Sequence, residues 1–87
     1  MYGREEYRKL QADLSANLRG KRNYDKAISE YCKKKKLTVE NGFIFDDWNN
    51  TMALKIVDER PAWYSLDIVE LPFPMEFMKQ FGSVMSL

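Results

Sequence analysis

Residues 37–45 read LTVENGFIF, and this stretch decides how the chain folds. Asn41 and Gly42 separate two short runs of strand-forming residues, 37–39 and 43–45. Asparagine and glycine tolerate the positive φ angles that both central positions of a type I′ turn require. We therefore predict a tight antiparallel hairpin here, and the periodicity of the chain changes from helical to strand-like at its start.

Two further strand-like runs follow the hairpin. Residues 52–57 come after the polar stretch 49–51, and residues 63–71 come after 58–61, which have the composition of a turn. Apolar and polar residues alternate in the last run, which is typical of a sheet with one covered and one wetter face. The second half of the chain therefore predicts a four-stranded antiparallel meander.

The residues before the hairpin have the period of two amphipathic helices. Apolar residues recur at helical spacing over residues 4–19 and again over residues 24–32. Gly20 is expected to end the first helix, and Asn23 is a good N-cap for the second. The lysines at 33–36 suit the negative end of the second helix dipole.

The end of the chain predicts a third, shorter helix. Pro72 and Pro74 should end the last strand, because proline lacks the N–H group that a sheet requires. From Met75 onward, apolar residues fit a short helix. We thus expect a single α+β domain over residues 1–87, with two N-terminal helices, the meander and a short C-terminal helix, and with the helices packed on one sheet face.

The composition excludes most catalytic and metal-binding arrangements. The 87 residues contain no histidine and one cysteine, so a Ser-His-Asp triad and a Cys/His zinc site cannot form within one chain. The four glycines are too far apart in the sequence for a phosphate-binding loop. We therefore expect a protein that is not an enzyme, with no cofactor and no metal site, and we interpret Cys32 as a buried apolar residue.

Two acidic pairs are compatible with metal-dependent nuclease activity, which is a minor alternative. Asp46-Asp47 and Asp58-Glu59 both fall in expected turns, where clustered carboxylates can hold Mg²⁺, although acidic residues in turns are usually only solvated. The order of elements also resembles that of small bacterial ribonuclease toxins, in topology alone. Such toxins usually begin with a strand, which this chain does not show.

The sequence predicts a cytoplasmic protein that does not enter a membrane. A lone cysteine fits a reducing compartment. Acidic residues interrupt the apolar positions near the N-terminus, and no apolar run approaches the ~20 residues that a membrane span requires.

Charge is distributed unevenly along the chain. Residues 1–37 hold 11 basic and 5 acidic residues, a net charge of +6, whereas the remainder holds 3 and 8, a net charge of −5. Such asymmetry arises either from two faces that bind different partners or from two halves that attract each other in the fold. The sequence leaves both interpretations open.

Basic residues beside the apolar stripe of the first helix suggest an alternative function. Arginines and lysines in such a row can contact the phosphates of a nucleic-acid backbone, but their stems can equally cover the rim of a hydrophobic face. The residues predicted for this nucleic-acid-binding strip are Arg4, Arg8, Arg19, Lys21, Arg22 and Lys26.

The leading interpretation is a non-catalytic protein-binding module. Interfaces favour aromatic residues and methionine, which are abundant in the second half. Phe73, held extended between two prolines, suits an anchor in a partner pocket, and equally suits a plug at the end of the core. The predicted partner-binding residues are Trp48, Asp58, Glu59, Trp63, Tyr64, Phe73 and Met75.

Phages and mobile elements often encode small domains of this kind as inhibitors that occupy a surface on a larger macromolecule, and we expect such a protein here. Mimicry of nucleic acid by the acidic second half is a third interpretation. The sequence does not decide between a monomer and a homodimer.

Overall fold

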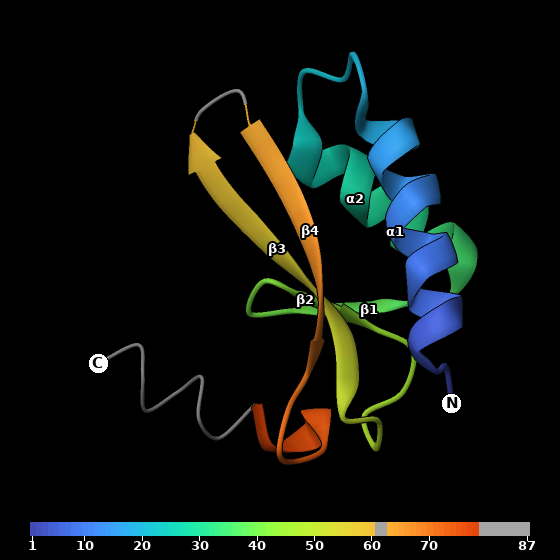
Figure 1. Ribbon diagram of the computed structural model, residues 1–87. Coiled ribbons are helices and arrows are strands. Elements are labelled where there is room, and N and C mark those ends of the chain that lie inside the picture. Colours follow the sequence, from blue (N-terminus) through green and yellow to red (C-terminus); the bar gives the residue numbers. More distant parts are fainter. Residues whose placement is uncertain (61–62, 79–87) are drawn as a thin grey trace.

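The computed structural model describes the backbone of residues 1–60 and 63–78, and the side chains of residues 1–57 and 65–78 (Figure 1). Two helices lie on the same side of a four-stranded antiparallel sheet, as the sequence predicts. The elements in chain order are α1 (Arg4–Leu18), α2 (Tyr24–Lys35), β1 (Thr38–Glu40), β2 (Phe43–Phe45), β3 (Met52–Arg60), β4 (Trp63–Glu70) and the 3₁₀ turn η1 (Met75–Phe77).

Local capping residues fix the helix boundaries. The Gly3 N–H donates to Glu6 Oε1 at 2.7 Å at the start of α1, and the Asn23 side chain accepts from the Lys26 N–H at 3.1 Å at the start of α2. Both bonds satisfy amides that have no partner within the helix. The chain leaves α1 through Gly20, whose φ of 76° is the left-handed conformation that glycine favours.

The strands follow one another across the sheet in the order β1-β2-β3-β4, and each pair is antiparallel. Glu40 pairs with Phe43, which leaves a two-residue turn. Its central residues, Asn41 and Gly42, have φ angles of 51° and 83°. These positive values are those of a type I′ turn, so the predicted hairpin is confirmed.

The turn predicted at 58–61 is wrong at its start, because β3 continues to Arg60. Val57 pairs with Ser65 and Arg60 pairs with Trp63, so two residues of β3, Asp58 and Glu59, lie opposite one residue of β4. This is the geometry of a β-bulge. The bulge takes up the two acidic residues that the sequence suggested for a turn.

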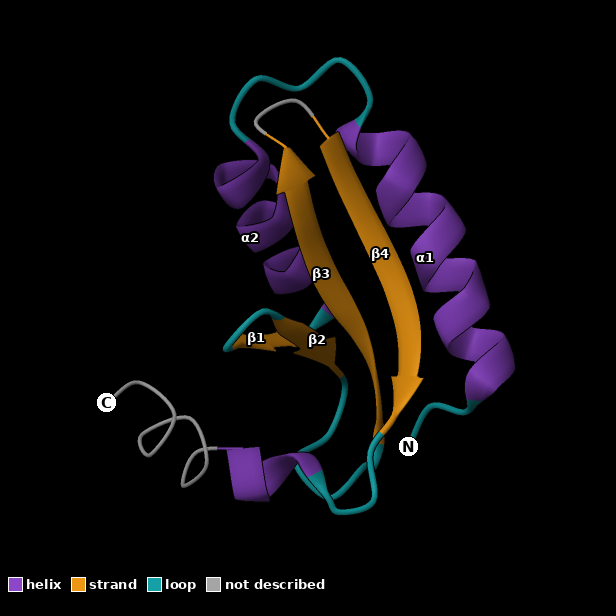
Figure 2. Ribbon diagram, turned by 60° about the vertical axis from the view of Figure 1, so that its left-hand side comes forward, coloured by secondary structure: helices purple, strands orange, loops and turns teal. Residues whose placement is uncertain are grey.

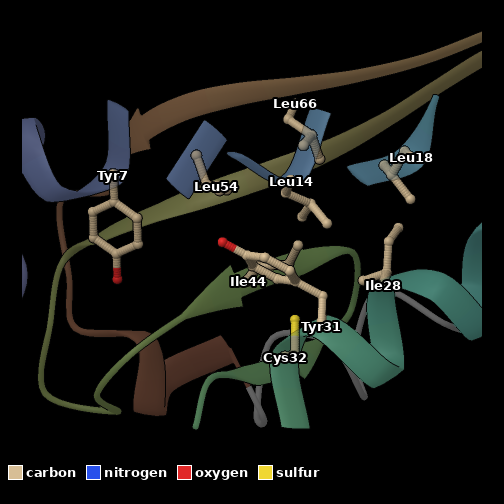
Figure 3. Close-up of a cluster of buried hydrophobic side chains, with 9 residues drawn as sticks. All are labelled: Tyr7, Leu14, Leu18, Ile28, Tyr31, Cys32, Ile44, Leu54 and Leu66. Carbon is tan, nitrogen blue, oxygen red and sulfur yellow. The ribbon is translucent and has the colours of Figure 1, made fainter. Parts of the chain in front are cut away.

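Apolar side chains pack on both faces of the sheet. The cluster between the helices and the sheet is drawn in Figure 3 and consists of Tyr7, Leu14, Leu18, Ile28, Tyr31, Cys32, Ile44, Leu54 and Leu66. A smaller cluster on the opposite face consists of Phe45, Ala53 and Met75, with Phe43, Trp48, Val69, Leu71 and Met78 packed against it. Met75, which the sequence assigned to partner binding, is fully buried and is a core residue in this structure.

The predicted C-terminal helix is replaced by the single turn η1 in the described part of the chain. The Met75 N–H donates to Asn50 O and the Glu76 N–H donates to Trp48 O, both at 2.8 Å. These bonds dock the segment on the loop between β2 and β3 and bury Met75 in the smaller cluster, which favours a short turn. The rest of the predicted helix, residues 79–87, lies outside the described residues.

Candidate interaction surfaces

Asp46 organises the end of the molecule where the N-terminus, the β2–β3 loop and the C-terminal segment meet. Its carboxylate accepts hydrogen bonds from the Tyr7 hydroxyl, from Asn50 Nδ2 at 2.8 Å and from the Tyr2 N–H at 2.9 Å. Asn50 also donates to Tyr2 O at 2.9 Å and accepts from the Met52 N–H at 3.0 Å. This hydrogen-bond network holds the N-terminal residues against the β2–β3 loop, to which the C-terminal segment is bonded through its backbone.

These contacts set the protonation state of two groups. Burial alone would raise the pKa of Asp46, but hydrogen bonds from Tyr7, Asn50 and backbone amides outweigh it and lower the pKa. Burial and the neighbouring carboxylate raise the pKa of Tyr7. The pair is therefore an ionised acid and a protonated phenol. Asp46, which the sequence placed in a solvated turn, is a partly buried structural acid.

An aromatic surface lies on residues 72–78, which we call the C-terminal ledge. Phe73 and Phe77 meet edge to face with ring centroids 6.2 Å apart. Phe77 is 41% exposed and Phe73 is half-buried, while Pro72 and Glu76 are exposed beside them. An aromatic pair with one exposed ring next to an acidic side chain has the composition of a protein-binding hot spot with a polar rim.

Residues of β2, of the β1–β2 turn and of the β2–β3 loop support the C-terminal ledge. Trp48 is half-buried and packs edge to face on the buried Phe45, with centroids 4.7 Å apart. The turn residue Asn41 donates from Nδ2 to Met78 O at 3.4 Å. With the two backbone bonds to the β2–β3 loop, these contacts order the backbone that carries the aromatic pair.

The predicted partner-binding residues do not form one surface. Trp48 and Met75 pack in the smaller cluster and Phe73 lies two residues before Met75, whereas 58–59 and 63–64 lie at the far end of the β3–β4 ribbon. At about 3.3 Å per residue, the two groups are separated by roughly 20 Å. The side chains of the second group lie outside the described residues. Sequence reasoning missed Phe77, whose position beside Phe73 becomes evident only once η1 is placed.

Every residue of the predicted nucleic-acid-binding strip is exposed, but the strip is not one continuous row. Arg4 Nη2 lies 3.5 Å from Glu70 Oε1 on β4, and Gln11 on the same flank of α1 donates to Leu66 O. This side of α1 runs along β4, which is an edge strand of the sheet. Arg19 lies beyond the end of α1 in an extended conformation, with Lys21 and Arg22 in the connection to α2.

The two interpretations of charge asymmetry can be separated in part. Among residues whose side chains are described, the Arg4–Glu70 contact is the one ion pair within 4.0 Å, and it joins the basic half to the acidic half. The other basic residues of the helices are exposed, which leaves the outer side of the helical layer positively charged.

A groove of about 410 Å³ runs between α1 and α2 on this outer side. Tyr31 donates to Asp13 Oδ2 there at 2.7 Å, and burial together with this carboxylate raises the pKa of Tyr31. The phenol is thus held protonated, which is the opposite of what a general base requires. The residues that line the groove are Tyr2, Glu6, Lys9, Leu10, Asp13, Tyr31 and Lys35.

Cys32 and the acidic residues do not form a reactive centre in the described structure. Cys32 is buried and burial raises the pKa of its thiol to about 11. The described side chains include no group of three or more metal-ligating residues. No helix within the described ranges has the length and apolar character needed to cross a membrane.

No protein-family model, curated protein or solved structure matches this chain.

Proposed function

We propose that the protein is a non-catalytic binding module that docks on a protein partner through the C-terminal ledge. The observation that carries this proposal is the pairing of the exposed Phe77 with Phe73 on a backbone anchored to the core. Large aromatic side chains that fill a pocket dominate the energy of many interfaces. The partner is expected to present an apolar pocket.

Anchoring of the C-terminal ledge reduces the entropy that binding would otherwise cost. Met75 is fully buried, and the amides of Met75 and Glu76 are bonded to the β2–β3 loop at 2.8 Å. A preorganised backbone loses less conformational freedom on association than a loose one. The exposed Glu76 favours a partner pocket with a basic rim.

We extend this proposal to the biological role of the protein and to its location in the cell. It would act by occupying a surface on a larger macromolecule, as the small inhibitors encoded by phages and mobile elements do. A cytoplasmic location is part of the proposal, because the single buried cysteine suits a reducing compartment.

Site-specific crosslinking in the native cell tests the proposal. A photoreactive amino acid replaces Phe77 in one variant and Ala12, an exposed residue of α1, in a control variant. We expect a discrete protein adduct from position 77 and none of the same mass from position 12. The same adduct from both positions, or no protein adduct at position 77, would contradict binding through the C-terminal ledge.

A second candidate is binding to a nucleic-acid backbone, and the exposure of Arg19, Lys21, Arg22 and Lys26 at and near the α1–α2 connection favours it. Phosphate contacts release counterions, so the affinity for an oligonucleotide would fall steeply as salt rises. Binding through the C-terminal ledge would respond weakly to salt. A salt titration of the two complexes therefore separates the candidates.

A further inference from the structure

The last described residue of the chain lies beside the β1–β2 turn. Asn41 donates from Nδ2 to Met78 O at 3.4 Å, and Met78 is the last residue that the structure describes. The β1–β2 hairpin lies between α2 and η1 in Figure 2, so its tip faces the segment that carries Met78. The chain therefore enters residues 79–87 at the tip of this hairpin.

An apolar hollow of about 220 Å³ opens beside the same turn, between α2 and the sheet. Its lining residue Val39 lies two positions before Asn41. Its lining residue Ile56 lies across from Gly42, because the Ile56 N–H donates to Gly42 O at 2.7 Å. The residues that line the hollow are Asp25, Ile28, Ser29, Val39 and Ile56.

Val39 is an apolar residue on the core-facing side of the sheet that nevertheless remains exposed. It pairs with Ile44, which is fully buried in the cluster between the helices and the sheet. Paired residues of antiparallel strands place their side chains on the same face. Val39 is 41% exposed, however, and Ile56 is half-buried. A further apolar side chain in the hollow would remove both surfaces from water, which is favourable.

The segment that follows Met78 has a composition that suits this hollow. Phe81 comes three residues after Met78 and Val84 comes six residues after it. An extended chain advances at most about 3.3–3.6 Å per residue, so the two positions have a reach of roughly 10 and 20 Å. The step from Asn41 to Val39 is roughly 7 Å along the strand. Phe81 is thus the first apolar residue of the segment that can reach the hollow.

The size of the hollow favours an occupant from the same chain. One side chain in a hollow of this volume buries far less than the ~1,200–2,000 Å² of a stable interface between separate proteins. A segment that is already attached to the rim needs much less contact, because its effective concentration is in the millimolar range. The contact between Asn41 and Met78 O provides that attachment.

We propose that the hollow is the docking site of the chain's own residues 79–87, with the side chain of Phe81 between Val39 and Ile56. The docked segment passes around the β1–β2 turn and covers the exposed part of Val39. The aromatic pair of the C-terminal ledge takes no part in this contact. The proposal therefore does not depend on what binds to the C-terminal ledge.

Nuclear magnetic resonance of the full-length protein tests this docking directly. We expect nuclear Overhauser effects between the ring protons of Phe81 and the methyl protons of Val39 and Ile56. A sample that mixes labelled and unlabelled protein separates contacts within one chain from contacts between two copies. Contacts between copies, contacts of residues 79–87 with the C-terminal ledge alone, or no contact with the hollow would overturn the proposal.

A pair of substitutions in the docked segment provides a matched comparison. Phe81→Ser removes the proposed occupant and should shift the methyl signals of Ile28, Val39 and Ile56. Gln80→Ser changes the neighbouring polar position and should leave these signals in place. Unchanged methyl signals in Phe81→Ser, or equal shifts in both variants, would contradict the docking of Phe81.

A second pair of substitutions tests the hollow itself. Val39→Arg places a cation at the hollow and should remove the contact between Phe81 and Ile56. Ala12→Arg adds the same charge on the exposed face of α1 and should retain that contact. The spectra of both variants show whether they are folded. A folded Val39→Arg variant that keeps the contact would show that the segment docks elsewhere, and the proposal would be wrong.

Discussion

The carboxylate of Asp46 accepts the hydroxyl hydrogen of Tyr7, a residue 39 positions earlier in the chain. The Tyr7 oxygen in turn accepts from the Asp46 N–H at 3.1 Å. The first helix is thus bonded to the β2–β3 loop on which the C-terminal ledge rests. The packing of Tyr7 against Tyr2, with centroids 5.8 Å apart, adds an aromatic contact at the same place.

Tyr7→Phe should destabilise the protein, because it removes the hydroxyl and leaves the partly buried Asp46 carboxylate with one donor fewer. A hydrogen bond to a charged group is typically worth about 1.5–3 kcal/mol. Urea unfolding measures the loss, and Tyr2→Phe, which alters a phenol on a more exposed residue, serves as the control. Identical unfolding midpoints for Tyr7→Phe and wild type would show that the network contributes nothing to stability.

The lowered pKa of Asp46 predicts how stability depends on pH. A carboxyl group whose pKa is lower in the folded than in the unfolded state stabilises the fold above its ordinary pKa of about 3.9. That contribution is lost as the pH falls through the lowered value.

Asp46→Asn should therefore be less stable than wild type at neutral pH, and its stability should fall less as the solution is acidified. Urea midpoints measured from pH 7 down to about pH 3 provide the comparison. Asp67→Asn, at an exposed position of β4, controls for loss of one negative charge. If Asp67→Asn flattens the profile as much as Asp46→Asn, the effect belongs to net charge.

Cys32 should react slowly with thiol reagents while the protein is folded. Its thiol is buried, and a pKa of about 11 leaves on the order of a hundredfold less thiolate at pH 8 than a free cysteine has. Labelling with a chromogenic disulfide should accelerate by at least that factor in denaturing urea. Equal rates in the two states would contradict the buried position of Cys32.

Gly42→Val should destabilise the hairpin through the backbone alone. Gly42 has a φ of 83°, and a Cβ atom added there meets no atom within 4 Å, so the cost is strain and not a clash. A β-branched residue in this conformation costs on the order of 1–3 kcal/mol. Thermal unfolding should show a smaller loss for Gly42→Asn, because asparagine tolerates positive φ. Equal melting of the two variants would contradict the type I′ turn.

The elements that could be predicted from the sequence are those whose signals are local. The cap at Asn23 and the turn at Asn41-Gly42 each involve residues within a few positions of one another, and both are confirmed. Local signals failed at Asp58 and Glu59, because a bulge can hold acidic residues inside a strand as readily as a turn can. Composition alone does not distinguish these two structures.

The candidate site depended on contacts between distant residues. The Met75 amide is bonded to Asn50 O, and this bond decides that the segment docks as η1. The sequence did contain one sign that a later segment covers the second face of the sheet. Phe43 and Phe45 alternate with the buried Ile44, so β2 is apolar on both faces. A sheet face with two phenylalanines requires a cover, and the C-terminal segment supplies it.

The most direct test of the C-terminal ledge is a titration of the crosslinked partner, purified, with the folded Phe77→Ala variant. We predict that its dissociation constant rises by about 30-fold or more, which corresponds to the roughly 2 kcal/mol of a hot-spot residue. A variant with Arg19, Lys21 and Arg22 replaced by alanine should bind the partner with nearly wild-type affinity. Wild-type binding by Phe77→Ala, together with loss of binding by the triple variant, would contradict the account and transfer the function to the basic helical layer.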